Sequence, residues 1–99
     1  MANIAENTLY AYSENNQVIN IIKNFIEENF DYCINYIEEN QLELVFDSSW
    51  EFPEEEMDEL YSLIKNFNNF YIRVLSLELC NHYHALFYCD ETTGGWVED

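Results

Sequence analysis

The chain has 99 residues and a formal net charge of −17, because 20 aspartates and glutamates stand against three lysines and arginines. So few basic residues exclude direct binding to nucleic acid or to an anionic membrane surface, since the phosphates could not be neutralised. Because 48% of the residues are hydrophobic and 17% are aromatic, a packed core is not excluded, and we expect one acidic domain over residues 1–99.

The first predicted strand covers residues 8–13, "TLYAYS", which form a short β-rich segment. Ser13 is expected to cap the helix that follows, and this helix should end near residue 29. Its apolar residues recur at helical spacing and predict one buried face, formed by Val18, Ile21, Ile22, Phe25 and Ile26.

Beyond this helix the apolar pattern changes to a period of two. Tyr32, Ile34 and Tyr36 alternate with more polar residues, and the same alternation returns after the polar "EENQ". This pattern predicts a β-hairpin with strands over residues 32–36 and 42–46. A single long helix over residues 14–39 is the competing interpretation.

Pro53 suits the first turn of a second helix, and the three glutamates after it suit the positive end of a helix. The buried stripe of this helix is predicted to contain Met57, Leu60, Tyr61, Ile64 and Phe67. A strand is expected over residues 70–79, then a turn at 80–81 and a last strand over 82–89. The tail, residues 91–99, should be mostly loop.

The predicted order is therefore β-α-β-β-α-β with one further strand. Two amphipathic helices of this kind pack on one face of an antiparallel sheet. We accordingly expect an α+β protein with a ferredoxin-like fold.

Cysteine and histidine gather near the predicted last hairpin, at Cys80, His82, His84 and Cys89. Zinc accepts both residue types, but the paired ligands of a structural zinc site are missing, so we expect exposed histidines and no metal or other cofactor. A Cys–His nucleophile would also need an oxyanion hole, for which no motif is present. Both glycines lie in the tail, so no phosphate-binding loop is expected. These observations argue against an enzyme.

The chain starts without a basic region followed by a long apolar run, so we expect no signal peptide. The apolar runs are also far shorter than the ~20 residues that span a membrane. The three cysteines are then expected to be reduced, in a protein that acts in the cytoplasm.

Carboxylates form three clusters. The largest lies at the start of the second predicted helix, a second at the end of the first helix contains Glu27, Glu28 and Asp31, and a third around the predicted hairpin turn contains Glu38, Glu39 and Glu43. An acidic first turn stabilises a helix, and charged helix faces are commonly only solvated. Carboxylates near the end of the first helix, in contrast, oppose the helix dipole, which favours a role in binding. We expect a basic partner to contact Glu54, Glu55, Glu56, Asp58 and Glu59, with support from Glu27, Glu28, Glu38 and Glu39 and with Trp50 as an aromatic anchor.

Residues 42–53, "LELVFDSSWEFP", combine a strand that ends in Phe-x-Ser-x-Trp with a proline that opens a helix. Together with the opening "ANIAENTLYAYS", this segment resembles the YubB ferredoxin-like domain family of phage and plasmid proteins. The resemblance covers nearly the whole chain. It implies a ferredoxin-like fold and an origin in a mobile genetic element, and it implies no catalytic residues.

Small size, acidity and this implied origin predict a phage or mobile-element inhibitor of a bacterial defence system, such as an anti-CRISPR or anti-restriction protein. The chain would mimic DNA and occupy the basic nucleic-acid-binding surface of a CRISPR effector subunit, a restriction enzyme or another nuclease in the host cytoplasm. An immunity protein that neutralises a basic toxin nuclease is the alternative. A metal or thiol protein that uses the hairpin at residues 80–84 is a third reading, and a homodimer formed through the sheet edge stays open.

Overall fold

All strands of the protein belong to a single antiparallel sheet that carries both helices on one face. The structure, a computed structural model, describes residues 4–78, 80 and 82–99. The elements are β1 (Ile4–Ser13), α1 (Asn16–Asn29), β2 (Tyr32–Ile37), β3 (Gln41–Ser49), α2 (Glu54–Ile64), β4 (Phe70–Glu78), β5 (Tyr83–Asp90) and β6 (Val97–Glu98).

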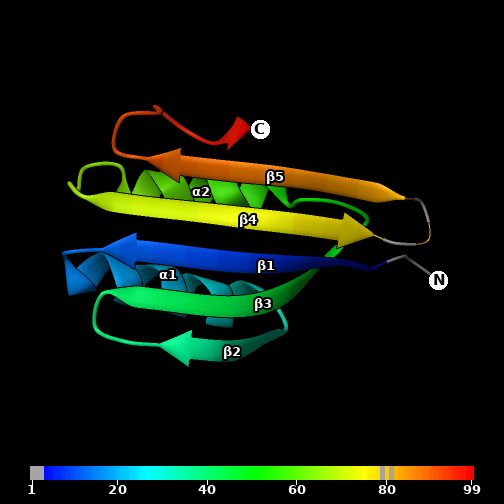
Figure 1. The fold of residues 1–99 in the computed structure, drawn as a ribbon, viewed down its shortest axis with the longest axis horizontal. Helices are drawn as coiled ribbons and strands as arrows, with labels where there is room; N and C mark the ends of the chain where they lie inside the picture. Colours follow the sequence, from blue (N-terminus) through cyan, green and yellow to red (C-terminus); the bar gives the residue numbers. More distant parts are fainter. Residues whose placement is uncertain (1–3, 79, 81) are drawn as a thin grey trace.

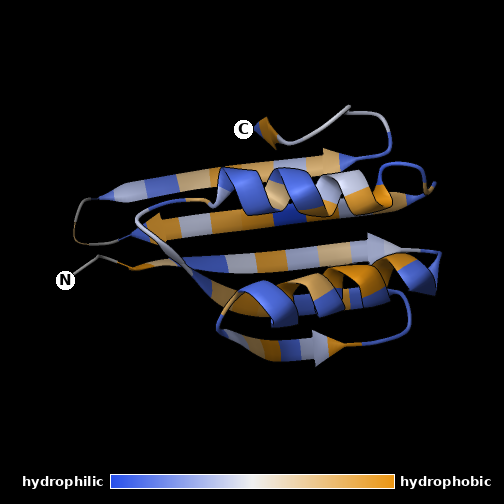
Figure 2. Ribbon diagram, turned by 180° about the vertical axis from the view of Figure 1, so that it is seen from behind, coloured by the Kyte–Doolittle hydropathy of each residue, from blue (hydrophilic) through white to orange (hydrophobic). Residues whose placement is uncertain are grey.

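The strand order in the sheet is β2-β3-β1-β4-β5-β6. Both helices lie behind the sheet in Figure 1 and in front of it in Figure 2. The predicted α+β class, with two helices on one face of an antiparallel sheet, is therefore confirmed. The arrangement is compatible with a ferredoxin-like fold, to which β5 and β6 add at the β4 side.

The N-cap of the first helix lies two residues later than predicted. Asn15 is the N-cap, and its side chain accepts a hydrogen bond of 2.9 Å from the N–H of Gln17. Ser13 is instead the last residue of β1, and its buried Oγ accepts a bond from the N–H of Asn15. The helix ends at Asn29, so the alternative of one helix over residues 14–39 is wrong.

The two hairpins follow the predicted periodicity with small shifts at their ends. In the first, β2 and β3 pair from Tyr32 opposite Phe46 to Ile37 opposite Leu42, with a register shift between Ile34 and Tyr36. In the second, β4 and β5 pair up to Glu78 opposite Tyr83. Leu79, predicted to end the β4 strand, and Asn81, in the predicted turn, lie outside the described residues.

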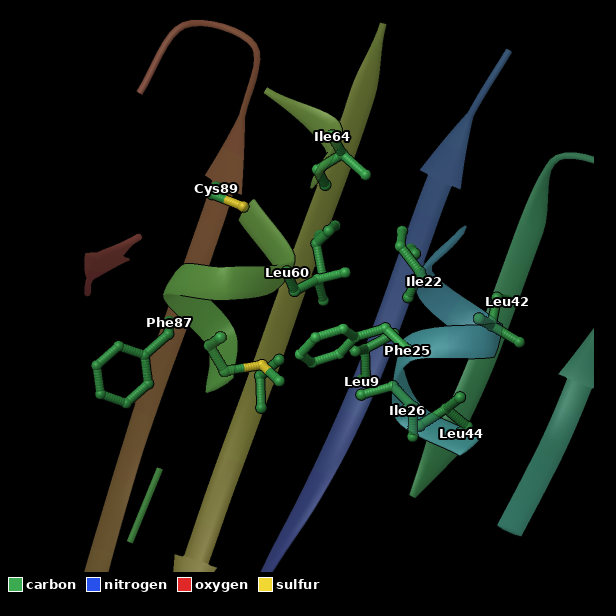
Figure 3. Close-up of a cluster of buried hydrophobic side chains, with 14 of the residues drawn as sticks. Leu9, Ile22, Phe25, Ile26, Leu42, Leu44, Leu60, Ile64, Phe87 and Cys89 are labelled. Atoms are coloured by element: carbon green, nitrogen blue, oxygen red, sulfur yellow. The ribbon is translucent and has the colours of Figure 1, made fainter. Parts of the chain in front are cut away.

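Alternation along the strands places one row of side chains under the helices. Leu9, Leu42 and Leu44 of the sheet lie against α1, which contributes Ile22, Phe25 and Ile26 (Figure 3). On the other side of this core, Leu60 and Ile64 of α2 lie over Cys89 and Phe87 of β5 (Figure 3). Ile19 is also buried, at 2% exposure, whereas the predicted Ile21 is only half-buried.

The C-terminal tail contains the turns that the sequence predicts, but it also docks onto the domain. Residues 91–95 form turns and bends, after which Val97 pairs with Tyr88 of β5. The indole Nε1 of Trp96 donates a hydrogen bond of 2.7 Å to the carbonyl of Met57 in α2. Its ring meets the edge of Phe52 at 5.4 Å between centroids. The tail therefore ties β5 to the start of α2.

Replacing Trp96 tests this attachment. We expect Trp96→Phe to lower the free energy of unfolding by about 1 kcal/mol, because the hydrogen bond to Met57 is lost. Trp96→Ala should lower it by about 2 kcal/mol, because the contact with Phe52 is lost as well. Urea unfolding measures both values. The control is Trp50→Ala, which removes an indole that is 51% exposed and should change stability by less than about 0.5 kcal/mol. Equal effects of the two alanine variants would contradict a docked tail.

Candidate functional site

A groove of about 850 Å³ lies where α1 ends and α2 begins. Its walls come from the end of α1 and the connection to β2, and from the end of β3, the connection to α2 and the first turn of α2. The lining is mainly acidic, with eight of its residues carrying carboxylates: Glu27, Glu28, Asp31, Asp47, Glu51, Glu54, Glu55 and Glu56. The fold thus brings together acidic residues from two separate stretches of the chain, residues 27–31 and 47–56.

The wall formed by the β3–α2 connection is held by an aromatic anchor. Phe52 is buried, at 3% exposure, and stacks on Phe87 with 3.8 Å between ring centroids. Its N–H donates a hydrogen bond of 3.3 Å to the hydroxyl of Tyr83. Because Phe52 is fixed to β5 in this way, the acidic residues on either side of it, Glu51 and Glu54, are held at the groove.

A chain of hydrogen bonds attaches the same connection to the sheet. The buried side chain of Asn7 in β1 donates to Ser48 Oγ at 2.8 Å and to the carbonyl of Phe46 at 3.1 Å. Ser48 Oγ in turn donates to the carbonyl of Glu51 at 2.6 Å. These bonds fix the path of residues 48–51 along the groove.

Backbone pairing brings two further acidic residues together. The N–H of Asp47 donates a bond of 3.1 Å to the carbonyl of Asp31, which extends the β2–β3 pairing by one step. Phe30 packs against Phe46 beside this bond, with 4.6 Å between ring centroids. Residues 30 and 31 are thereby held at the end of β3 after α1 has ended.

Glu27 is the one acidic residue of the groove that forms an ion pair within the described part of the chain. Lys23 Nζ lies 2.8 Å from its Oε1, and the hydroxyl of Tyr32 donates a bond of 2.6 Å to its Oε2. The bond from Lys23, followed by that from Tyr32, lowers the pKa of Glu27. Its carboxylate therefore has a local role at the end of α1, besides any role in binding.

The helix ends have opposite electrostatic effects on this site. Glu54, Glu55 and Glu56 occupy the first turn of α2, where the helix dipole favours negative charge. Glu28 lies in the last turn of α1, where neither a basic residue nor the dipole favours it. The carboxylates of both helix ends lie at the same groove and repel one another, so this end of the molecule is strongly negative.

The structure brings some of the predicted contact residues together and separates others. Glu27, Glu28, Glu54, Glu55 and Glu56 all line the groove. Asp58 lies one turn further along α2, in a smaller depression of about 260 Å³ beside Trp96. Glu59 is exposed on α2, and Trp50 is exposed between two groove residues with a φ of 71°.

Glu38 and Glu39 belong to a different surface. They lie in the turn between β2 and β3, at the opposite end of the sheet from the groove (Figure 1). Glu39 lines a second depression, of about 570 Å³, together with Glu14 and several asparagines. Hydrogen bonding to the Glu38 carboxylate raises the pKa of Tyr36. A single flat partner surface at the groove would not reach this turn.

Asp47 and Glu51 line the groove although neither was predicted as a contact residue. The signal for Asp47 lay in the predicted hairpin, because a register that pairs Tyr32 with Phe46 also places Asp47 beside Asp31. Glu51 offered no such signal, since its position depends on the burial of Phe52 against β5.

The cysteines and histidines of the last hairpin do not converge. Cys89 points into the core. His84 lies five residues earlier on the same strand, is exposed, and faces the other side of the sheet. Cys80 and His82 are exposed beyond the end of β4. Burial, with a smaller contribution from Asp90, raises the pKa of the Cys89 thiol to about 12. Within residues 4–78, 80 and 82–99, no group of three or more His, Cys, Asp or Glu side chains is arranged so that it could hold a metal ion.

Comparison with known proteins found no matching family model, curated protein or solved structure. The resemblance to the YubB family therefore remains a prediction from the residues that carry it. In the part of the chain that the structure describes, neither helix is long and apolar enough to cross a membrane.

The contacts of Glu27 predict how its ionisation responds to substitution. Lys23→Met should raise the pKa of Glu27 toward its ordinary value, and Tyr32→Phe should raise it less, since the Lys23 bond is the larger cause. Because the folded pKa lies below the unfolded one, ionised Glu27 stabilises the fold above the unfolded pKa, and this stabilisation is lost as the pH falls through the folded pKa.

A carboxyl NMR titration of the folded protein measures these shifts. The matched control is Lys65→Met, which removes an exposed lysine that caps the far end of α2. If this control moved the pKa of Glu27 as far as Lys23→Met does, total charge rather than the local bond would set its value.

Thiol reactivity tests the burial of Cys89. We expect Cys33 and Cys80 to react with an exposed-thiol reagent in the folded protein, because both are exposed. Cys89 should react only after unfolding, because it is buried and its raised pKa leaves almost no thiolate. Cys89→Ser should remove the unfolding-dependent reaction alone. Reaction of all three thiols at one rate in the folded state would overturn this assignment.

Proposed function

We propose that this protein binds the basic surface of a nucleic-acid-binding protein and thereby excludes the nucleic acid. The observation that carries the proposal is the acidic groove, which gathers eight acidic residues from two separate stretches of the chain, residues 27–31 and 47–56. A cluster drawn from separate segments depends on the fold and not on a single acidic run. It offers a fixed arrangement of carboxylates to the lysines and arginines of a phosphate-binding site.

The overall density of charge supports mimicry of a nucleic acid. The net charge of −17 is spread along a longest extent of 39 Å, which is one charge for about every 2.3 Å. Duplex DNA carries one charge for every ~1.7 Å of its axis. A protein surface that is adapted to DNA would therefore meet a comparable field, and electrostatic steering would accelerate the encounter.

The scarcity of cations supports the same proposal. Lys23 is paired with Glu27, and the guanidinium of Arg73 lies 4.8 Å above the ring of Tyr10. The described part of the chain contains a single ion pair, so the other groove carboxylates are left without a cation from their own chain. Cations of a partner would relieve this repulsion, which makes binding favourable and sensitive to salt.

In biological terms, we propose a phage or mobile-element inhibitor of a bacterial defence system, acting in the host cytoplasm. The target would be a CRISPR effector subunit, a restriction enzyme or another nuclease. Small size, acidity and the resemblance to the YubB family support this assignment, and so does a helix-covered sheet that is compatible with a ferredoxin-like scaffold. We propose binding and not catalysis.

The test compares two variants with equal net charge. The groove variant combines Glu28→Gln, Glu54→Gln, Glu55→Gln and Glu56→Gln, all at residues that line the groove. The control variant combines Glu14→Gln, Glu38→Gln, Glu39→Gln and Glu91→Gln, all at exposed residues that do not line it. Glutamine keeps the length and helix propensity of glutamate, and circular dichroism checks that both variants fold.

Each tagged protein is incubated with a bacterial lysate, and bound proteins are eluted with rising salt and then with duplex DNA. We expect the native chain and the control variant to capture a nucleic-acid-binding protein that DNA displaces. The groove variant should bind that protein at least about 100-fold more weakly. Equal binding by the two variants, or a partner indifferent to DNA, would exclude the proposal. Capture of a toxin nuclease would instead favour an immunity protein.

A further inference from the structure

The face of the sheet that the helices leave uncovered is unusually apolar. Figure 1 looks directly onto this open face. The open face of an antiparallel sheet usually alternates polar residues outward against apolar residues inward. Here the outward positions of β1, β3, β4 and β5 instead include four tyrosines and four aliphatic residues: Tyr10, Tyr12, Tyr71, Tyr88, Val45, Leu75, Leu77 and Leu86.

Strand register makes these side chains one continuous patch. Leu75 on β4 lies opposite Thr8 on β1 and Leu86 on β5, at the centre of the open face. One step along, Arg73 lies opposite Tyr10 and Tyr88, and its guanidinium covers the Tyr10 ring. Leu75 is 40% exposed and lies beside Leu77 and Leu86 on this face. An exposed apolar patch across three adjacent strands indicates an interface.

The open face carries little of the charge of the chain. Its outward positions on the same four strands hold one cation, Arg73, and four carboxylates, Glu6, Glu43, Asp47 and Asp90. Their sum is −3, compared with −17 for the whole chain. A partner attracted by negative charge would therefore bind elsewhere on the molecule, and the open face suits a partner recognised by apolar burial.

The dimensions of this face match those of a stable interface. The two longer extents of the molecule, 39 and 25 Å, bound a face of about 980 Å², whereas a standard interface buries ~800 Å² on each partner. Tyrosine is also enriched in the buried centre of such interfaces, as it is here.

We propose that the open face binds the open face of a second copy, so that two sheets pack face to face in a homodimer. A two-fold axis sets the same patch against itself, so that the apolar side chains around Leu75 of one copy meet those of the other. The sheets would lie ~10 Å apart, as in other sheet-on-sheet packings. The helices of both copies stay on the outside, so the homodimer presents both acidic grooves. The inference rests on the sheet and stands independently of the proposed function.

Salt distinguishes this association from binding at the groove. Two chains of charge −17 repel each other, while burial of the open face attracts them. Raising the salt from about 0.1 M to about 1 M shortens the Debye length from ~10 Å to ~3 Å and screens the repulsion. The homodimer should therefore become tighter with salt, whereas binding of a basic partner should become weaker.

Sedimentation equilibrium of the full chain over this range of salt provides the test. We expect a reversible dimer whose dissociation constant falls as the salt rises. Leu75→Glu should raise that constant by about 100-fold or more, since the two-fold symmetry places the new charge twice in the interface. A monomeric mass at every salt concentration would overturn the proposal.

The matched control is Leu63→Glu, which makes the same substitution on α2. Leu63 is 50% exposed and lines a depression between the two helices, on the opposite side of the molecule from the open face. It should leave the dimer nearly unchanged, and thermal unfolding checks that both variants fold. If Leu75→Glu and Leu63→Glu weakened the dimer equally, net charge alone would govern the association. If Leu75→Glu left the dimer unaffected, the interface would lie elsewhere. Either result contradicts the proposal.

Discussion

Burial of one face of the sheet under two helices is the constraint on which the rest of the structure depends. The chain must hold 20 carboxylates near one another with three cations, and each close pair of like charges opposes folding. The opposing contribution comes from side chains such as Leu9, Ile22 and Leu60, which are fully buried between sheet and helices. Burying a side chain of this kind contributes about 1.5–3 kcal/mol. The acidic surface is therefore compatible with folding only because the layer beneath it is continuous and apolar.

The same arrangement explains why acidic residues meet in a groove. The chain leaves α1 for β2, and later leaves β3 for α2, at one end of the sheet. Asp31 and Asp47 are joined there by a backbone hydrogen bond, and Phe52 fixes the following connection to β5. Two separate stretches of the chain, residues 27–31 and 47–56, thus present their acidic residues together. An inserted connection or a different anchor in place of Phe52 would disperse them.

Two surfaces of the molecule are expected to respond to solution conditions in opposite ways. The groove has a high density of carboxylates, so that it would attract cationic partners at low salt. The open face has little charge and many apolar atoms, so that its association is opposed only by the charge of the rest of the chain. A homodimer of this kind would double the negative charge near one partner surface. The protein would then have a recognition side and an assembly side.

The sequence by itself determined the local structure, because periodicity reports which side of an element is buried. Val18, Ile22 and Phe25 at helical spacing identified α1, and the alternation around Tyr32 and Leu44 identified the first hairpin. It also placed Glu54 at the start of α2, since Pro53 and the acidic run are features of helix starts. These features depend on neighbours within a few residues, which the linear order contains.

Only the tertiary structure decided which distant residues lie together. It grouped Glu28, Asp47 and Glu51 in one groove and left Glu39 at the opposite end of the sheet. It sent Cys89 into the core and His84 outward, which separated the two halves of the predicted Cys–His cluster. It also turned a tail expected to be loop into a support, because Trp96 bonds to Met57. The physical reason is that strand order and helix placement are fixed by burial of the whole core, and no local pattern of residues contains that information.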